Sequence, residues 1–491
     1  MISKSFIKSS LVYTIIGALP LASSIILLPF YGNHTLLSTS DFGLLAIYIV
    51  LSELARVLFT FATDNFMGLN YIHYSSVKEE REKFIGTSTL FMLLYSGGLL
   101  LLFSSIGNYI FSVAYPGKDL HFFPYGFLSL LTGLFNGIFK SYTTLQIYRE
   151  KPLPYFWSNV VHFSIVLIVT IVGLYLKPLS LAAPVWGRFS GALVTFIWSI
   201  VFLISQSRLK FDLVVLKRLL SYSAPLYIYN ILFWIINNID RYFILGLMSE
   251  KSVAIFDFAV KISMAIEFIQ NGLSGAISPK IFKLWKQRGD KPAGDIEINK
   301  YFHTFTMVNI LFVPFYYILV PLLVPVVVNN KELYASFALL PLLFAGRIVR
   351  VWYYYLSMPI FYFQKTKIMP IVFGITAAFQ IVTTYLLIKF DGINGAVWGS
   401  FFTKIVQVVL LFVFVRNFYK FNVNFKKIFV FPFAYILSLI VIHEFLPSIS
   451  YFTHTAIQIL VIFVTGYFVY RNEFNISSII NLLKKDSSSK Q

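Results

Sequence analysis

Apolar runs of about 20 residues recur from one end of this chain to the other, separated by short polar segments. At 1.5 Å per residue, a helix of that length crosses a hydrocarbon layer of about 30 Å. Charged residues make up only 12% of the 491 residues, whereas soluble domains carry about 25%. The sequence therefore predicts an all-α, polytopic membrane protein, and no segment is polar enough to form a soluble domain.

Turn residues and charges divide the apolar runs into about fourteen spans. The first run follows two lysines like a signal peptide, but it stays apolar for longer than the core of one. The predicted spans are 9–31, 42–63, 84–110, 120–147, 154–176, 180–205, 220–247, 252–276, 303–328, 334–361, 368–388, 393–415, 428–446 and 452–470.

The lysines and arginines between the spans are distributed unevenly. If both termini are cytoplasmic, the inside segments hold 27 of them and the outside loops hold 5. Such a bias sets the orientation of multi-pass proteins, so we expect both termini in the cytoplasm. The same bias accounts for the net charge of +19, and we expect no nucleic-acid partner.

Several kinds of site chemistry are excluded or disfavoured. The chain has no cysteine, which removes thiolate metal sites, iron–sulfur clusters and a thiol nucleophile. Its seven histidines are scattered and show no spacing of metal ligands. We therefore expect no metal site, no cofactor and no catalytic residue.

A weak internal repeat divides the chain. Residues 185–189 read Val-Trp-Gly-Arg-Phe and residues 397–401 read Val-Trp-Gly-Ser-Phe, a shift of 212. Residues 37–43 align with residues 248–254 at nearly the same shift. Parallel repeats pack around an axis along the membrane normal and leave a path between them. We expect two pseudo-symmetric six-helix lobes around a central cavity, plus two C-terminal helices. The predicted parts are an N-lobe at 1–205, a cytoplasmic linker at 206–219, a C-lobe at 220–416, two further spans within 417–471 and a cytoplasmic tail at 472–491.

Short motifs in a fixed order carry a family resemblance. They lie at residues 40–46, 224–226, 239–245, 365–367 and 392–396. With these motifs against fourteen spans, the chain resembles, over essentially its whole length, the O-antigen type of polysaccharide-biosynthesis flippase. That family belongs to the multidrug/oligosaccharidyl-lipid/polysaccharide exporter superfamily. Residues 254–256 depart from the family pattern, where glycine and tyrosine are common.

The resemblance implies a function and a location. It implies export of an undecaprenyl-diphosphate-linked repeat unit of O-antigen, capsule or exopolysaccharide across the bacterial inner membrane, from the inner to the outer leaflet, by alternating access. Expected partners are this lipid-linked oligosaccharide and membrane lipid, with polysaccharide polymerase machinery as a candidate, and a monomer is expected to function. The alternatives are a multidrug or lipid II exporter of the same superfamily and a membrane enzyme of polysaccharide assembly. An enzyme would need long carboxylate-bearing loops, whereas the longest predicted loop, 278–301, is basic.

Cations inside the spans are candidates for binding the substrate, because burying a charge in hydrocarbon is costly. Arg347 and Arg350 lie three apart, share a helix face and have no acidic residue on their own helix. An arginine fork matches phosphate oxygens in pairs, so we expect these two to contact the diphosphate. The aromatic run at 352–355 could stack on sugars or belong to an interfacial belt. The remaining candidates for the diphosphate and sugar cavity are Lys404, Arg188, Arg56, Lys261 and Asn237.

Some acidic residues inside the spans are expected to form local ion pairs, and some are candidates for binding a coupling ion. Glu53 with Arg56, and Asp257 with Lys261, have the spacing of local ion pairs on one helix face. Glu53, Asp257 and Glu267 are the candidates for binding a coupling proton or sodium ion. Eight intramembrane cations outnumber five anions, which favours an anionic substrate over a drug cation.

Overall fold

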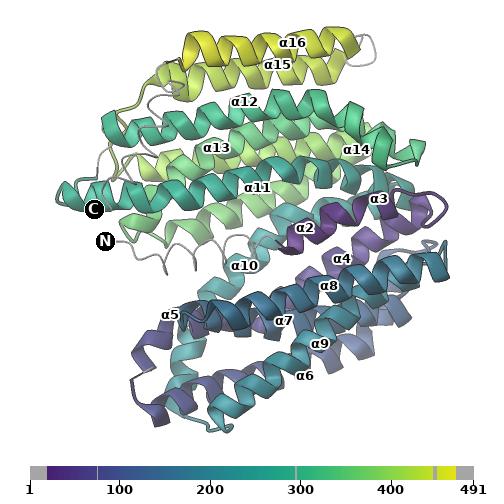
Figure 1. Cartoon of the computed structure of the whole chain (residues 1–491), viewed down its shortest axis with the longest axis vertical. Helices are drawn as coiled ribbons and strands as arrows, with labels where there is room; N and C mark the ends of the chain where they lie inside the picture. The colour runs from purple at the N-terminus through teal and green to yellow at the C-terminus, as the bar shows by residue number, and fades with distance from the viewer. Residues whose placement is uncertain (1–18, 75, 293–295, 446–450, 472–491) are drawn as a thin grey trace. The chain divides into compact units, whose positions relative to one another are not determined.

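The computed structural model describes residues 19–74, 76–292, 296–445 and 451–471, which form helices and short connections (Figure 1). Contacts between Cα atoms divide the chain into two compact units. Unit 1 comprises Met1–Asp257 and Val328–Leu333, and unit 2 comprises Phe258–Val327 and Tyr334–Gln491. The predicted tail at 472–491 lies outside the described residues.

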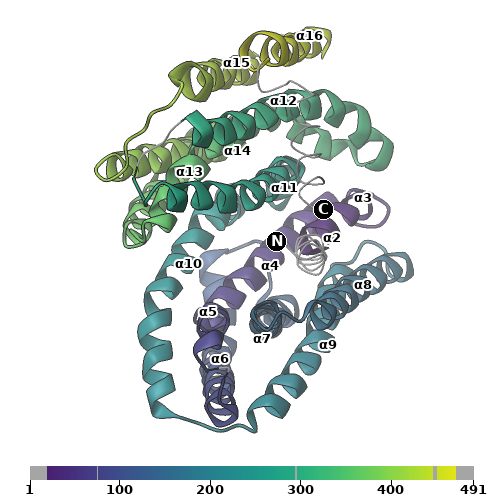
Figure 2. The same cartoon turned by 60° about the vertical axis from the view of Figure 1, so that its left-hand side comes forward.

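Unit 1 is built around α4 and α7, which pack along each other, while α8 packs along α9 (Figure 2). Aromatic and aliphatic side chains of α4, α5, α6 and α7 form its buried core. The helices of unit 1 are α2 (Leu19–Ile26), α3 (Leu28–Tyr31), α4 (Thr39–Thr60), α5 (Thr63–Tyr74), α6 (Lys78–Ala114), η1 (Phe122–Gly126), α7 (Phe127–Tyr148), α8 (Pro152–Leu176), α9 (Ala182–Ser207), α10 (Leu213–Leu247) and the first residues of α11 (Glu250–Gln287).

Unit 2 is built around α13, which packs against both α14 and α15. The hydroxyl of Tyr435 on α15 donates a buried 2.7 Å hydrogen bond to the side-chain oxygen of Gln458 on α16. The helices of unit 2 are most of α11, α12 (Ile296–Val327), the larger part of η2 (Lys331–Leu339), α13 (Leu340–Tyr362), α14 (Ile368–Val415), η3 (Lys426–Val430), α15 (Phe431–Phe445), α16 (Tyr451–Phe463) and η5 (Val464–Val469).

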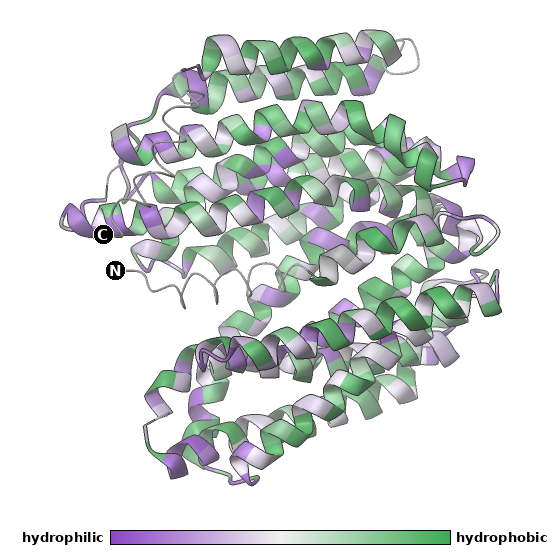
Figure 3. Cartoon of the chain, viewed as in Figure 1, coloured by the Kyte–Doolittle hydropathy of each residue, from purple (hydrophilic) through white to green (hydrophobic). Residues whose placement is uncertain are grey.

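The described residues contain 11 helices that are long and apolar enough to cross a membrane. One of them, α14, covers two predicted spans, and α11 is not among them because it carries more polar residues. The first predicted span, 9–31, is described only from residue 19. In Figure 3 hydrophobic colour dominates the helices, and hydrophilic colour gathers at helix ends and turns. The all-α, polytopic membrane fold predicted from the sequence is confirmed.

Residues 391 and 392 break α14 into two helical halves. Asp391 has φ −136° and ψ 20°, and Gly392 has φ 56° and ψ −131°, a region that side chains with a Cβ rarely adopt. Just beyond the break, a Cβ at Gly395 would lie 2.0 Å from the carbonyl oxygen of Leu387. The two glycines therefore allow the chain to turn and the two halves to pack closely, as the predicted division into spans 368–388 and 393–415 requires.

The repeated Val-Trp-Gly motif makes equivalent contacts in its two copies. A Cβ at Gly187 of α9 would lie 2.1 Å from the hydroxyl oxygen of Thr170 on α8. A Cβ at Gly399 would lie 2.7 Å from that of Thr384 in the first half of α14. Each glycine thus lets its helix approach a threonine of the preceding one. These contacts agree with a repeat, while the lobe boundaries inferred from it stay a prediction.

Two local features differ from the sequence interpretation. The second predicted span, 42–63, ends early, because Phe61 and Ala62 adopt left-handed φ values of 48° and 54° and separate α4 from α5. The predicted loop at 278–301 is largely helical, since α11 continues to Gln287 and α12 begins at Ile296. In both places the error came from using hydropathy to set the helix ends, because hydropathy does not report backbone conformation.

Candidate functional site

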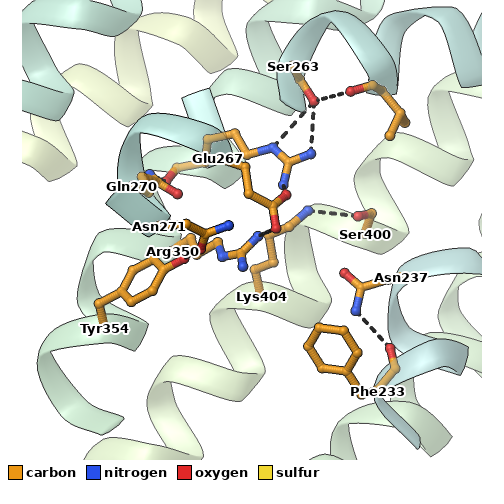
Figure 4. A network of polar contacts seen from close by, with 12 residues as sticks. Phe233, Asn237, Ser263, Glu267, Gln270, Asn271, Arg350, Tyr354, Ser400 and Lys404 are labelled. Atoms are coloured by element: carbon orange, nitrogen blue, oxygen red, sulfur yellow. Dashed lines mark hydrogen bonds and ion pairs between the residues drawn. The ribbon is translucent and has the colours of Figure 1, made fainter. Parts of the chain in front are cut away.

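Polar side chains gather on one face of α11 inside unit 2. Glu267 lies four residues after Ser263, and Gln270 and Asn271 lie three and four residues after Glu267, so these side chains lie on the same side of the helix. Two arginines of α13 and a lysine of α14 lie opposite this stripe (Figure 4). We call Glu267, Arg347, Arg350 and Lys404 the Glu267 cluster.

Glu267 bridges the two arginines of α13. One carboxylate oxygen, Oε2, accepts from Nη1 of Arg347 at 2.5 Å, and the other, Oε1, pairs with Nη1 of Arg350. The side chains are 23%, 10% and 18% exposed for Glu267, Arg347 and Arg350 respectively. The carboxylate therefore occupies both guanidinium groups in this structure, and it is the most accessible of the three.

Arg347 has supports besides Glu267. Its Nε and Nη2 atoms donate to the hydroxyl of Ser263 at 3.3 and 3.0 Å. Its backbone carbonyl accepts from the side-chain amide of Gln270 at 2.7 Å. Two residues of α11 thus fix Arg347 from both ends, and its position does not depend on the carboxylate alone.

Arg350 packs against an aromatic ring. Its guanidinium carbon lies 5.5 Å from the ring centre of Tyr354, a distance at which a cation is attracted to the ring face. The hydroxyl of Tyr354 donates to the side-chain oxygen of Asn271. One residue of the aromatic run at 352–355 therefore packs against a cluster arginine.

Lys404 supplies the third cation. Its ammonium group donates to the hydroxyl of Ser400 at 2.8 Å and acts electrostatically on Glu267. Its side chain passes over Gly346, where an added Cβ would come within 3.3 Å of Nζ. The Glu267 cluster thus contains three positive groups and one negative group, and the hydroxyls of Ser263 and Ser400 accept hydrogen bonds from two of the cations.

Unit 1 contains a separate buried ion pair. Nε of Arg241 on α10 donates to Asp257 on α11 at 2.8 Å, and the two side chains are only 6% and 4% exposed. Arg241 also donates to the carbonyl of Asn237 and lies 5.6 Å from the ring centre of Phe256. The structure thus pairs Asp257 with an arginine of the preceding helix, and the local pair of Asp257 with Lys261 stays a prediction.

The predicted pair of Glu53 and Arg56 is wrong. Neither side chain has an ion pair among the residues that the structure describes. Glu53 is the one exposed residue of α4, a helix described in full, and Arg56 is partly buried. The spacing allowed the pair, but it did not specify the side-chain directions.

Three further residues that were predicted to line the substrate cavity are not members of the Glu267 cluster. Arg188 lines a small cavity of unit 1 together with Tyr48, Ser52 and Thr132, and its Nε atom is buried without a hydrogen-bond acceptor among the described residues. Asn237 is exposed and donates to the carbonyl of Phe233 at 2.7 Å. Lys261 is partly buried on α11 in unit 2.

The supporting residues of the cluster were not predicted. Ser263, Gln270, Asn271 and Ser400 carry no charge, so a search for intramembrane charges passes over them. A signal was present, because polar residues at spacings of three and four on an otherwise apolar helix indicate a face turned away from lipid.

Comparisons with known proteins agree on the fold. The structure of the lipid II flippase MurJ in an inward closed conformation matches 95% of this chain and 99% of its own, with a TM-score of 0.70 and 15% identity. Inward-facing and outward-facing structures of a MATE family multidrug resistance transporter of the MOP superfamily each match 84% of this chain. They match 98% and 95% of their own chains, with TM-scores of 0.59 and 0.55 and identities of 13% and 12%. At such identities the similarity establishes a shared fold.

A search of curated protein sequences gave no match. A family model described as polysaccharide biosynthesis protein matches residues 6–285, more than half of the chain. The family resemblance inferred from the short motifs is thereby confirmed, and the chain belongs to the polysaccharide biosynthesis protein family.

Proposed function

We propose that this protein is a flippase that moves an undecaprenyl-diphosphate-linked oligosaccharide from the inner to the outer leaflet of the bacterial inner membrane by alternating access. The oligosaccharide is a repeat unit of O-antigen, capsule or exopolysaccharide. Both termini lie in the cytoplasm, the protein acts as a monomer, and membrane lipid and polysaccharide polymerase machinery are its neighbours. The family match and the shared fold with MurJ support this proposal.

The Glu267 cluster is the observation that carries the proposal. Three cations and one carboxylate leave a net charge of about +2 within apolar helices, where each charge is costly to bury. A diphosphate joined to a lipid at one end and to a sugar at the other carries two negative charges. The cluster therefore has the charge and the paired arginine geometry to receive the diphosphate.

The alternatives differ in how well they fit the same cluster. A cationic drug would meet a net positive site and be repelled. Lipid II carries a diphosphate as well, so the cluster would accept it, and the family match to polysaccharide biosynthesis favours the oligosaccharide. An enzyme of polysaccharide assembly is disfavoured because the acidic groups of unit 1 and unit 2 described above are held by arginines or stand alone.

Reconstitution in liposomes tests the proposal directly. We expect the purified protein to make an undecaprenyl-diphosphate-linked oligosaccharide, placed in one leaflet, accessible to a membrane-impermeant sugar-oxidising reagent on the other side. Protein-free vesicles provide the background rate. Transfer of lipid II or of a fluorescent drug cation, without transfer of the oligosaccharide by a folded protein in an ion gradient, would reject the proposal.

Glu53 is the carboxylate best placed to couple transport to an ion gradient. Asp257 and Glu267 are both held by arginines, whereas Glu53 is exposed and has no ion pair among the described residues. We expect Glu53→Gln to slow gradient-driven transfer by about tenfold, the effect of 1.4 kcal/mol, and to leave slow downhill transfer unchanged. Glu79→Gln, which removes an exposed carboxylate paired with Lys83, is the matched control. Equal gradient dependence in wild type and Glu53→Gln would exclude this role.

A further inference from the structure

The arginine pair of the Glu267 cluster is already occupied by an anion that belongs to the protein. Each oxygen of the Glu267 carboxylate pairs with one guanidinium group, that of Arg347 or that of Arg350. Carboxylate and phosphate oxygens make the same kind of charged hydrogen bonds to arginine. A diphosphate that binds these arginines must therefore take the place of the carboxylate.

The cluster is built so that the carboxylate can leave without collapse of the site. Arg347 keeps its hydrogen bonds to Ser263 and Gln270, and Arg350 keeps its contact with the ring of Tyr354. The Glu267 side chain is 23% exposed, more than either arginine. The carboxylate is thus the accessible and exchangeable member of the ion pairs, while the arginines are fixed.

A group that competes with the substrate is useful to a carrier, because the substrate must be bound weakly enough to be released. Three cations in a membrane interior, with no anion of their own, would hold a diphosphate strongly, since charges attract more strongly where the dielectric constant is low. The charged groups around the carboxylate are Arg347 and Arg350 from α13 and Lys404 from α14, all positive. Glu267 is the negative group of the cluster, so it alone can compete with a bound anion for these cations.

We propose that Glu267 is a tethered competitor of the diphosphate. It occupies Arg347 and Arg350 when the site is empty, yields them to the lipid-linked diphosphate, and takes them back when the substrate is released at the outer leaflet. This inference rests on the proposed function, and it assigns to Glu267 a role in release rather than in ion coupling.

A split between affinity and turnover tests the inference. The probe is undecaprenyl-diphosphate-linked N-acetylglucosamine, with its Kd measured in detergent and its transfer rate measured in liposomes. Glu267→Gln keeps the size of the side chain and removes its charge, so we expect the Kd to fall by about 10- to 100-fold, the range for a hydrogen bond to a charged group. We expect kcat to fall by a similar factor, because release becomes slower.

Two further variants make the test specific. Glu267→Asp keeps the charge but shortens its reach, so its Kd and kcat should lie between those of wild type and Glu267→Gln, and it remains informative if Glu267→Gln does not fold. Glu297→Gln removes an exposed carboxylate that pairs with Arg288 at 2.8 Å, and it should change neither quantity. An effect of equal size in Glu297→Gln would indicate a general electrostatic effect and overturn the inference.

The remaining outcomes separate this inference from the proposed function. A higher or unchanged Kd in folded Glu267→Gln would overturn the competitor role, since the carboxylate would then only support the arginines. A lower Kd with unchanged or faster turnover would overturn the role in release. If neither wild type nor any variant bound the lipid-linked probe, the proposed function itself would fail, and this inference with it.

Discussion

We expect the Arg347→Gln/Arg350→Gln/Glu267→Gln triple variant to transfer lipid-linked oligosaccharide at least about 100-fold more slowly than wild type, because it lacks two charged hydrogen-bonding groups for the diphosphate. Replacing the arginines alone would leave Glu267 charged in the membrane interior, which is itself destabilising. The triple variant removes all three charges and retains amides that can bond to one another. Its transfer rate is measured in liposomes after its thermal unfolding has been compared with that of wild type.

Two comparisons isolate the arginine geometry. Arg347→Lys and Arg350→Lys keep the positive charge but lose the fork, so each should slow transfer by about tenfold even though the net charge is unchanged. Arg288→Gln, which removes a partly buried arginine paired with Glu297, should transfer at the wild-type rate. A triple variant that folds and transfers at the wild-type rate would show that the diphosphate is bound elsewhere.

We expect Asp257→Ala to lower the free energy of unfolding of the protein by about 3–5 kcal/mol, because it leaves Arg241 buried without a counter-charge. Both side chains are nearly inaccessible, at 6% and 4%. The Arg241→Met/Asp257→Ala double variant removes both charges and should recover most of this loss. Thermal unfolding in detergent and abundance in membranes measure the effect.

A second ion pair of unit 1 provides a matched control for Asp257. Lys251 and Glu332 lie 2.8 Å apart, but their side chains are 56% and 51% exposed. Glu332→Ala should therefore change stability by no more than about 1 kcal/mol. If Asp257→Ala and Glu332→Ala had equal effects, burial would not be what makes the Arg241–Asp257 pair important.

The membrane-spanning helices were predictable because their signal is long and continuous. A run of about 20 apolar residues has few other uses in a protein, and the predicted spans from the second onward coincide largely with one helix, with two consecutive helical segments or with half of α14. The break between α4 and α5 was not predictable from hydropathy. Phe61 and Ala62 adopt left-handed φ values that neither residue type favours, so only the surrounding packing explains them.

The candidate site was only partly predictable, because spacing reports neighbours on one helix and not neighbours on another. The shared face of Arg347 and Arg350 followed from their spacing of three. Their partner, Glu267, lies 80 and 83 positions away on α11, and nothing in the local sequence of α13 indicates it. The same limit explains why Arg241 was not predicted as a partner of Asp257, because it lies on the preceding helix.

The turn at Asp391 and Gly392 also determines on which side of the membrane the rest of the chain emerges. A continuous helix of the 48 residues of α14 would be about 72 Å long, more than twice the thickness of a hydrocarbon core of about 30 Å. Because the chain turns there, α14 counts as two crossings rather than one, which reverses the side of the membrane on which α15 begins. One glycine with an unusual backbone conformation thus sets the sidedness of every residue that follows it.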